Sequence, residues 1–363
     1  MAALKLLAGL VVLTLGAELL IRSAVKLALA ARVSPLVIGL TVVAFGTSAP
    51  ELTVSLQSAW RGQADIAVGN VVGSNIFNVL FILGLSAVII PLVVHQKVIR
   101  FDVPLMIAVS LLLYGLSVDG VVGRIDGMLL FGLLVAYTVF SIVKSRREEA
   151  SIQAEYAQEF GNGRTPVTAI TALGWTALAA LALGLLIAGS RWFCDGAVEI
   201  ARTFGVSDLV IGLTLVAVGT SLPEVFTSVL AAIKGERDIA VGNVVGSNLF
   251  NILCVIGSSA AIAPNGVPVS PTALQLDLPV MIAAAVVCLP VFFTGHLIAR
   301  WEGALLLGYY VAYTAYLILE AASSDWSRTV ASILLVFVVP LTVITLLIGL
   351  VRALRDPARQ EGP

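Results

Sequence analysis

The sequence predicts an all-α polytopic membrane protein: two inverted five-helix repeats forming a ten-helix core, plus one additional carboxy-terminal transmembrane helix. Three observations lead to this fold class. Of the 363 residues, 59% are hydrophobic and only 12% are charged, and the mean hydropathy is +1.04. Apolar runs of about 20 residues, long enough to cross a bilayer, recur along most of the chain. One long segment also occurs twice, 173 residues apart.

The duplicated segment carries polar residues that membrane helices do not share by chance. Residues 36–84 and 209–257 align without a gap and are identical at 31 of 49 positions. The run DIAVGNVVGSN occurs unchanged at 65–75 and at 238–248. The shared positions include Gly, Thr, Ser, Pro, Glu and Asn, which a lipid-facing helix has no reason to repeat. The repeat therefore indicates a duplicated site to which both halves contribute.

The predicted helices fall into two sets of five around a polar stretch. We expect spans near residues 2–21, 36–60, 66–92, 102–119, 125–143, 167–191, 209–233, 239–263, 274–295, 301–320 and 329–351. The sequence FDVPLM at 101–106 resembles LDLPVM at 276–281, so the duplication extends beyond its core motif. A unit with an odd number of crossings re-enters the membrane from the opposite side. The two halves are therefore expected to be inverted, as is common in secondary transporters.

These spans define the expected domain organisation. It consists of a first repeat at 1–143 with its motif at 36–84, a cytoplasmic connector at 144–165, a second repeat at 166–322 with its motif at 209–257, an additional helix at 327–353, and a tail at 354–363. The distribution of positive charge predicts the orientation of the chain in the membrane. With the amino terminus outside, 15 of the 21 Lys and Arg residues lie in cytoplasmic segments. We therefore expect the central loop and the carboxyl terminus in the cytoplasm.

Composition and motifs exclude other classes of protein. A net charge of −1 argues against binding of nucleic acid. The chain contains no nucleophile–base pair, phosphate-binding loop or HExxH motif, so we expect no enzymatic activity, no catalytic residues and no cofactor. The sequence leaves the oligomeric state open.

Each copy of the motif interrupts its own helix. Pro50 and Pro223 have no backbone N–H, so the carbonyls of Gly46 and Gly219 lose their helical donors. A broken helix at membrane depth is tolerated where it lines a hydrated cavity or is buried in protein. The pattern therefore predicts accessible carbonyl oxygens around Ala44, Gly46 and Thr47, and again around Ala217, Gly219 and Thr220.

Polar side chains form one stripe on each motif helix. At about 100° per residue, the first helix of each motif presents one glutamate among hydroxyl groups. The stripes are Thr47, Ser48, Glu51 and Ser55, then Asn70, Ser74 and Asn78; in the second half they are Thr220, Ser221, Glu224 and Ser228, then Asn243, Ser247 and Asn251. Asn75 and Asn248 point about 100° away from these stripes, and the spacing does not decide between a ligand and a helix-bridging role. Gly69 with Gly73, and Gly242 with Gly246, have the spacing of close helix packing.

The chemistry of these groups indicates a metal cation. Every candidate ligand offers oxygen, and none is a histidine or a thiolate, which favours Na⁺, K⁺, Ca²⁺ or Mg²⁺ over zinc or copper. Ionisable residues inside a membrane are costly and are functional by default. We therefore expect Glu51 and Glu224 to face a divalent ion, with Ser74, Asn78, Ser247 and Asn251 as further ligands.

The paired GTSxPE and GNxxGSN motifs, one in each half, resemble the alpha repeats of the sodium/calcium exchanger family in the cation/Ca²⁺ antiporter superfamily. The resemblance covers about residues 1–322. It implies that Glu51, Glu224 and the carbonyls of Thr47 and Thr220 bind Ca²⁺. It implies Na⁺ sites at Ser48, Ser74, Asn78, Ser221 and Ser247 and at the carbonyls of Ala44 and Ala217. Some exchangers carry Asp at the position of Asn251, so this pocket holds two acidic groups.

The expected activity is secondary active antiport of cytoplasmic Ca²⁺ against Na⁺ by alternating access, in a prokaryotic cell (inner) membrane. Na⁺, Ca²⁺ and membrane lipid are the expected partners, and the two ions are substrates. An H⁺/Ca²⁺ or K⁺-dependent antiporter of the same fold is one alternative. A cation channel is an alternative of another class, and the inverted repeat argues against it.

Overall fold

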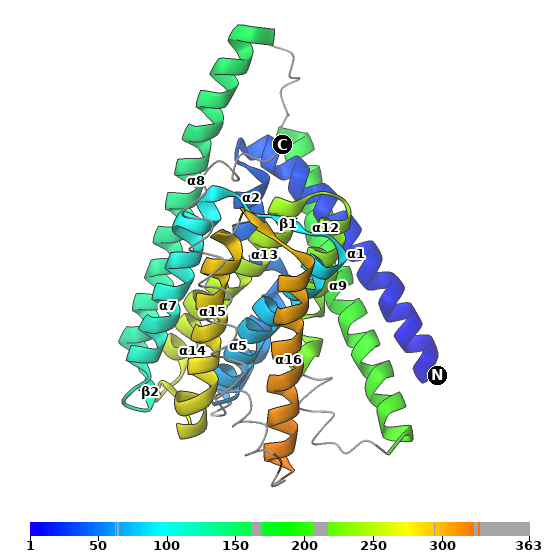
Figure 1. The fold of residues 1–363 in the computed structure, drawn as a ribbon, viewed down its shortest axis with the longest axis vertical. Helices are drawn as coiled ribbons and strands as arrows, with labels where there is room; N and C mark the ends of the chain where they lie inside the picture. The colour runs from blue at the N-terminus through cyan, green and yellow to red at the C-terminus, as the bar shows by residue number, and fades with distance from the viewer. Residues whose placement is uncertain are drawn as a thin grey trace.

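The computed structural model describes residues 1–61, 63, 65–160, 169–205, 217–293, 295–322 and 326. Its first half contains long helices (Figure 1). Several of these helices include a π-helical segment, labelled η here. In chain order the elements are α1 (Ala2–Ala31), α2 (Pro35–Ile38), η1 (Gly39–Val43), α3 (Ala44–Thr47), α4 (Ala49–Trp60), α5 (Asp65–Phe77), η2 (Asn78–Leu83), α6 (Gly84–Ile89), β1 (Leu92–Val93), η3 (Val98–Asp102), α7 (Val103–Leu116), β2 (Val121–Val122) and α8 (Arg124–Phe160).

The second half repeats this order. Its elements are α9 (Ala169–Thr203), α11 (Ala217–Gly219), α12 (Leu222–Ile233), α13 (Arg237–Phe250), η5 (Asn251–Ile256), α14 (Gly257–Ile262), β3 (Val267–Pro268), η6 (Ala273–Asp277), α15 (Leu278–Phe293), β4 (Leu297–Ile298) and α16 (Arg300–Ala321). Helices α5 and α13 each continue into a π-helical segment at the equivalent place, which begins at Asn78 in the first half and at Asn251 in the second.

The all-α membrane fold is confirmed. Among the described residues, eight helices are long and apolar enough to cross a membrane, and the bent pair of helices at 35–60 makes a ninth. Helix α8 continues to Phe160, so the first part of the predicted connector is helical. Residues 206–216, the additional helix at 327–353 and the tail lie outside the described residues.

The halves are joined by contacts that occur in equivalent pairs. Strand β1 pairs with β4, and β2 pairs with β3, both in antiparallel register. Helix α6 packs on α16, and α8 packs on α14. A Cβ atom at Gly84 would lie 2.9 Å from the carbonyl oxygen of Gly303, and one at Gly127 would lie 2.5 Å from that of Gly257. Both pairs of helices therefore need glycine where they touch.

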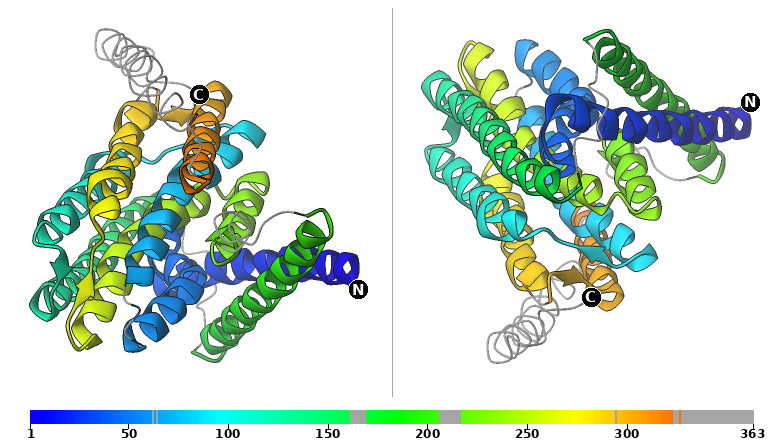
Figure 2. Two further views of the ribbon diagram at one scale, coloured as in Figure 1. Left: turned by 90° about the horizontal axis from the view of Figure 1, so that it is seen from below. Right: turned by 90° about the horizontal axis from the view of Figure 1, so that it is seen from above.

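Helices α1 and α9 pack along each other at one side of the molecule (Figure 2). Glycines on both helices permit this approach. A Cβ atom at Gly9 would lie 2.4 Å from the backbone nitrogen of Phe193, and one at Gly196 would lie 2.6 Å from that of Leu6. Close backbone approach through small residues is the usual way in which membrane helices associate.

Helix α13 lies at the centre of the molecule (Figure 1), and its side chains from Ile239 to Phe250 are all buried. The predicted packing role of Gly242 and Gly246 is confirmed, whereas that of Gly69 and Gly73 is wrong, because a Cβ atom at either of these two would meet no described atom within 4 Å. A Cβ atom at Gly246 would lie 2.6 Å from the carbonyl oxygen of Leu40 and 2.8 Å from the Cβ of Ala44. These glycines therefore hold α13 directly against the interrupted helix of the first half.

Candidate ion-binding pocket

The helix that carries the glutamate is interrupted in each half shortly before that residue. Ser48 separates α3 from α4 with φ −81° and ψ 8°, and the helix bends by 47° at this break. Ser221 precedes α12 with nearly the same backbone, φ −90° and ψ 6°. Pro50 and Pro223 lie in the first turn of the following helix, where a missing N–H is tolerated. The glutamates therefore begin a new helix beside a break.

Each glutamate accepts a hydrogen bond from a serine of the opposite half. Ser48 Oγ donates to Glu224 Oε1 at 2.9 Å, and Ser221 Oγ donates to Glu51 Oε1 at 2.8 Å. Both carboxylates are buried, with exposures of 0% for Glu51 and 1% for Glu224. The two breaks therefore meet in one pocket, as the duplication predicted.

The pocket holds buried oxygens without hydrogen-bond partners. Among the described residues that the sequence assigned to the site, these are Glu51 Oε2, Glu224 Oε2, Asn78 Oδ1, Asn251 Oδ1, Thr220 Oγ1 and Ser247 Oγ. No Lys, Arg or His in the described part of the chain forms an ion pair with either glutamate. Burial of such groups is costly unless something compensates them. A bound cation would supply that compensation, since every one of these atoms can act as a ligand to a hard metal ion.

Asparagine side chains of α5 and α13 donate hydrogen bonds to the helices that carry the glutamates. Asn70 donates to the backbone oxygen of Glu51 at 3.2 Å and to Ser55 Oγ at 3.0 Å. In the second half Asn243 donates to Ser228 Oγ at 2.9 Å. Asn243 Oδ1 also accepts from Thr47 Oγ1 at 3.1 Å. The polar side chains of α5 therefore contact α4, and those of α13 contact α12, the helix that carries the glutamate of the same half.

Of the other predicted residues, Ser74 directly contacts the pair of Ser221 and Glu51. Ser74 Oγ lies 3.5 Å from Glu51 Oε1 and 3.2 Å from Ser221 Oγ. Ser247 is fully buried on α13, and Asn78 and Asn251 begin the two π-helical segments. Thr220 lies in the turn before Ser221, while Ala44 and Ala217 begin α3 and α11.

The expected set of open carbonyls is wrong at two positions. The Ala44 oxygen accepts from Ser48 N at 3.0 Å and from Thr47 Oγ1 at 3.4 Å. Pro50 removes only the donor for Gly46, so the turn that ends at Ser48 keeps its hydrogen bond. The Gly219 oxygen accepts from the hydroxyl of Ser190 on α9. No feature of the motif indicates this contact, because Ser190 has no hydroxyl counterpart in the first half, where Ala17 occupies the equivalent position.

Four further residues lie beside the pocket: Asn75 and Asn248, for which the spacing left a ligand role and a helix-bridging role open, and Met106 and Met281, to which the motifs gave no role. Asn78 Nδ2 donates to Asn248 Oδ1 at 3.1 Å, and Asn251 Nδ2 donates to Asn75 Oδ1 at 3.1 Å. The only sequence signal for the methionines is their shared place in the FDVPLM and LDLPVM segments.

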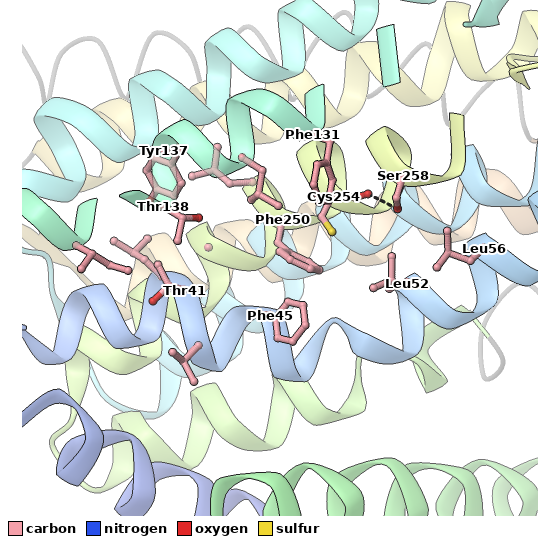
Figure 3. A pocket seen from close by; sticks show the side chains of 16 residues that line it. Thr41, Phe45, Leu52, Leu56, Phe131, Tyr137, Thr138, Phe250, Cys254 and Ser258 are labelled. Atoms are coloured by element: carbon pink, nitrogen blue, oxygen red, sulfur yellow. Dashed lines mark hydrogen bonds between the residues drawn. The ribbon is translucent and has the colours of Figure 1, made fainter. Parts of the chain in front are cut away.

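A separate cavity of about 510 Å³ lies between α2–α4, α8 and α13–α14 (Figure 3). Its lining is mostly apolar, and the rings of Phe45 and Phe250 meet edge to face there at 5.1 Å. None of the predicted ligands lines this cavity. The polar pocket around the glutamates is therefore distinct from it.

Comparison with known proteins supports a close family relationship. The chain matches the sodium/calcium exchanger protein family over residues 1–143 and 174–319. It is 40% identical to the putative antiporter CaxA of Alkalimonas amylolytica over 317 residues, covering 86% of this chain and 97% of that protein. It is 36% identical to the inner membrane protein YrbG of Escherichia coli over 323 residues (87% and 97% covered) and 33% identical to the sodium/calcium exchanger MaX1 of Methanosarcina acetivorans over 353 residues (86% and 97% covered).

The fold is similar to a solved structure of the same kind. The sodium-calcium exchanger NCX_Mj, soaked with 10 mM Na⁺ and no Ca²⁺, superposes with a TM-score of 0.73 at 28% identity, covering 86% of this chain and 98% of that one. Members of this family are secondary transporters rather than enzymes, and they move their ions without a cofactor. The family match, the relatives, the superposition and the duplicated motifs agree: this chain belongs to the sodium/calcium exchanger family.

Proposed function

We propose that this protein exports Ca²⁺ from the cytoplasm in exchange for Na⁺ by alternating access. One observation carries the proposal. Two buried carboxylates, each bonded to a serine of the opposite half, keep one oxygen each without a partner in the described part of the chain, in a pocket of oxygen ligands. Such a pocket suits a hard cation and offers no group for a thiol- or imidazole-preferring metal.

In this proposal Glu51 and Glu224 hold Ca²⁺ together with the carbonyls of Thr47 and Thr220. Na⁺ occupies positions around this centre, at Ser48, Ser74, Asn78, Ser221, Ser247 and Asn251 and at the carbonyls of Ala44 and Ala217. Oxygens from both carboxylates and from the hydroxyl and amide groups supply the six to eight ligands that Ca²⁺ typically takes. In the conformation of this structure, Ala44 would need to share its carbonyl oxygen with Ser48 N.

Coupling follows from shared ligands. Because Na⁺ and Ca²⁺ use overlapping oxygens, either Na⁺ ions or Ca²⁺ can neutralise the charge of the two glutamates. The two kinds of ion cannot occupy the pocket at the same time. An empty pocket with two unpaired carboxylates is costly in a low dielectric, so the protein changes its accessibility mainly when loaded. An exchanger therefore needs no further energy source than the Na⁺ gradient.

Membrane, direction and orientation are inferred from charge and from relatives. The excess of Lys and Arg in the proposed cytoplasmic segments supports an amino terminus outside and a central loop and carboxyl terminus inside. A prokaryotic inner membrane is consistent with the relative from Escherichia coli, which is named an inner membrane protein. The relative from Methanosarcina acetivorans is named a sodium/calcium exchanger, which favours Na⁺ as the driving ion.

The main alternative is H⁺/Ca²⁺ antiport, in which a glutamate carries the proton. It remains open because the relative with 40% identity is named only a putative antiporter. The test is ⁴⁵Ca²⁺ uptake into proteoliposomes with an imposed Na⁺, K⁺ or H⁺ gradient. Uptake driven by Na⁺ alone supports the proposal. Uptake driven only by the H⁺ gradient would contradict it, and Ca²⁺ leak without any opposing ion would indicate a channel.

A further inference from the structure

Four asparagines connect the two halves beside the ion pocket. Asn78 and Asn251 are proposed ligands, whereas Asn75 and Asn248 have no assigned role. All four side chains are at most 2% exposed. Asn78 Nδ2 donates to Asn248 Oδ1, and Asn251 Nδ2 donates to Asn75 Oδ1, each at 3.1 Å. Each proposed ligand is therefore bonded to an asparagine of the other half.

Each of these partner asparagines has a methionine on its far side. Asn248 Nδ2 lies 3.5 Å from Met106 Sδ on α7, and Asn75 Nδ2 lies 3.6 Å from Met281 Sδ on α15. The second hydrogen of Asn75 Nδ2 reaches the backbone oxygen of Asn248 at 3.3 Å. Met106 and Met281 are 1% and 2% exposed. These methionines are the last residues of FDVPLM and LDLPVM, the segments that extend the sequence repeat.

The sulfur atom imposes a direction on these hydrogen bonds. A carboxamide has a donor end and an acceptor end of nearly the same shape, so its surroundings decide how it is turned. A thioether sulfur carries no hydrogen and can only accept. Asn248 must then turn its NH₂ group toward Met106 and its oxygen toward Asn78.

The orientation of the Asn248 carboxamide fixes the orientation of Asn78, the proposed ligand. Because Asn78 faces the oxygen of Asn248, Asn78 must donate with its NH₂ group, and its own oxygen is turned away. That oxygen is buried and has no hydrogen-bond partner among the described residues. Similar contacts run from Met281 through Asn75 to Asn251, whose oxygen is likewise without a partner among the described residues. Here the backbone oxygen of Asn248 is a second acceptor that turns the NH₂ group of Asn75 in the same direction as Met281 does.

We propose that Met106 and Met281 are positioning residues for the ion pocket. Acting through Asn248 and Asn75, they turn the carboxamides of Asn78 and Asn251 so that oxygen, and not NH₂, is presented to the cation. This inference rests on the proposed function. A reversed carboxamide would present two partially positive hydrogens to a cation, so the sulfurs raise the affinity of the pocket without touching the ion.

The test removes the sulfur and keeps the shape. Met106→Leu and Met281→Leu are volume-conserving changes that buried sites tolerate well. Met128→Leu, at an exposed position on α8, is the control for the substitution itself. We expect the Ca²⁺ concentration for half-maximal Na⁺-driven exchange to rise roughly three- to tenfold in Met106→Leu, the loss expected for one hydrogen bond. The rise should be smaller in Met281→Leu, because the backbone oxygen of Asn248 still accepts from Asn75. The unfolding temperature of the ion-free proteins in detergent should match that of wild type.

A double-mutant cycle separates positioning from packing. If Met106 acts through Asn248, then Met106→Leu adds no further loss of Ca²⁺ affinity in an Asn248→Ala background. Additive losses, or a loss of affinity that follows a lower unfolding temperature of the ion-free protein, would show that the sulfur only fills space and would overturn the inference. Unchanged affinity in both single variants would overturn it directly. Absence of Na⁺-driven exchange in wild type is a different result, because it rejects the proposed function itself.

Discussion

Ser48 donates a hydrogen bond to Glu224 at 2.9 Å, although 176 positions separate the two residues. Ser221 and Glu51 form the equivalent bond in the other direction. Neither half therefore completes its own carboxylate site, since each glutamate depends on a hydroxyl from the helix break of the other half. Any movement of one break relative to the other changes the surroundings of both carboxylates at once.

Replacing either carboxylate with an amide should abolish transport of Ca²⁺. Glu51→Gln and Glu224→Gln keep the shape of the side chain, but each removes one of two charges that face the divalent ion. We expect ⁴⁵Ca²⁺ uptake in proteoliposomes to fall to background, with folding in detergent intact. Glu302→Gln is the matched control. Glu302 is also buried, but it accepts from Ala299 N at 2.8 Å at the start of α16, away from the pocket. Near-normal uptake in either pocket variant would refute the assigned site.

Removing the hydroxyls of Ser48 and Ser221 should weaken the binding of Na⁺ more than the binding of Ca²⁺. Ser48→Ala and Ser221→Ala each remove a proposed Na⁺ ligand. An interaction of a hydroxyl with a charged group contributes about 1.5–3 kcal/mol, so the half-maximal Na⁺ concentration should rise at least about tenfold. Ca²⁺ keeps both carboxylates and should lose less. Ser117→Ala is the control, because Ser117 is equally buried and bonds only Leu113 O of its own helix. Equal losses for both ions would show that the hydroxyls do not distinguish Na⁺ from Ca²⁺.

The sequence predicted the members of this pocket better than their pairing. Helical spacing places Ser48 and Glu51 on one face, but it carries no information on which helix lies opposite. The bond of Ser48 to Glu224 therefore needed the packing of both halves. The same limit applies to Ser190 and Gly219, which are joined by the position of α9. Spacing placed Asn75 and Asn248 about 100° from the other polar side chains, yet what they face depends on α7 and α15.

Adding one methyl group at the contact of α13 with η1 should destabilise the fold. In Gly246→Ala the new Cβ would lie 2.6 Å from the Leu40 carbonyl oxygen, so backbone must shift. Overpacking of this kind costs about 1–3 kcal/mol, which should appear as a lower unfolding temperature in detergent. Gly132→Ala on α8 is the control. Its Cβ meets no described atom within 4 Å, and we expect unchanged or slightly higher stability there. A stable Gly246→Ala protein would mean that the two helices separate easily.

Two equivalent Asp–Tyr pairs should differ in their effect on stability. Tyr137 donates to Asp102 at 3.1 Å, and Tyr313 donates to Asp277 at 2.8 Å. Asp102 is fully buried, whereas Asp277 is partly exposed, so water can replace the lost donor only at Asp277. Tyr137→Phe should therefore cost about 1–3 kcal/mol, and Tyr313→Phe should cost less. Unfolding of both variants by heat in the same detergent gives the comparison, and the reverse order would contradict the burial argument.

The contacts of α6 with α16, and of β1 with β4, have a consequence for biosynthesis. The partners of Gly84 and β1 are Gly303 and residues 297–298, which the ribosome delivers more than 200 positions later. A nascent chain that ends at residue 143 has inserted its helices but cannot bury these surfaces. Assembly of the first half is therefore deferred until translation of the second is almost finished, so this protein must pass through a long-lived, partly assembled stage within the lipid.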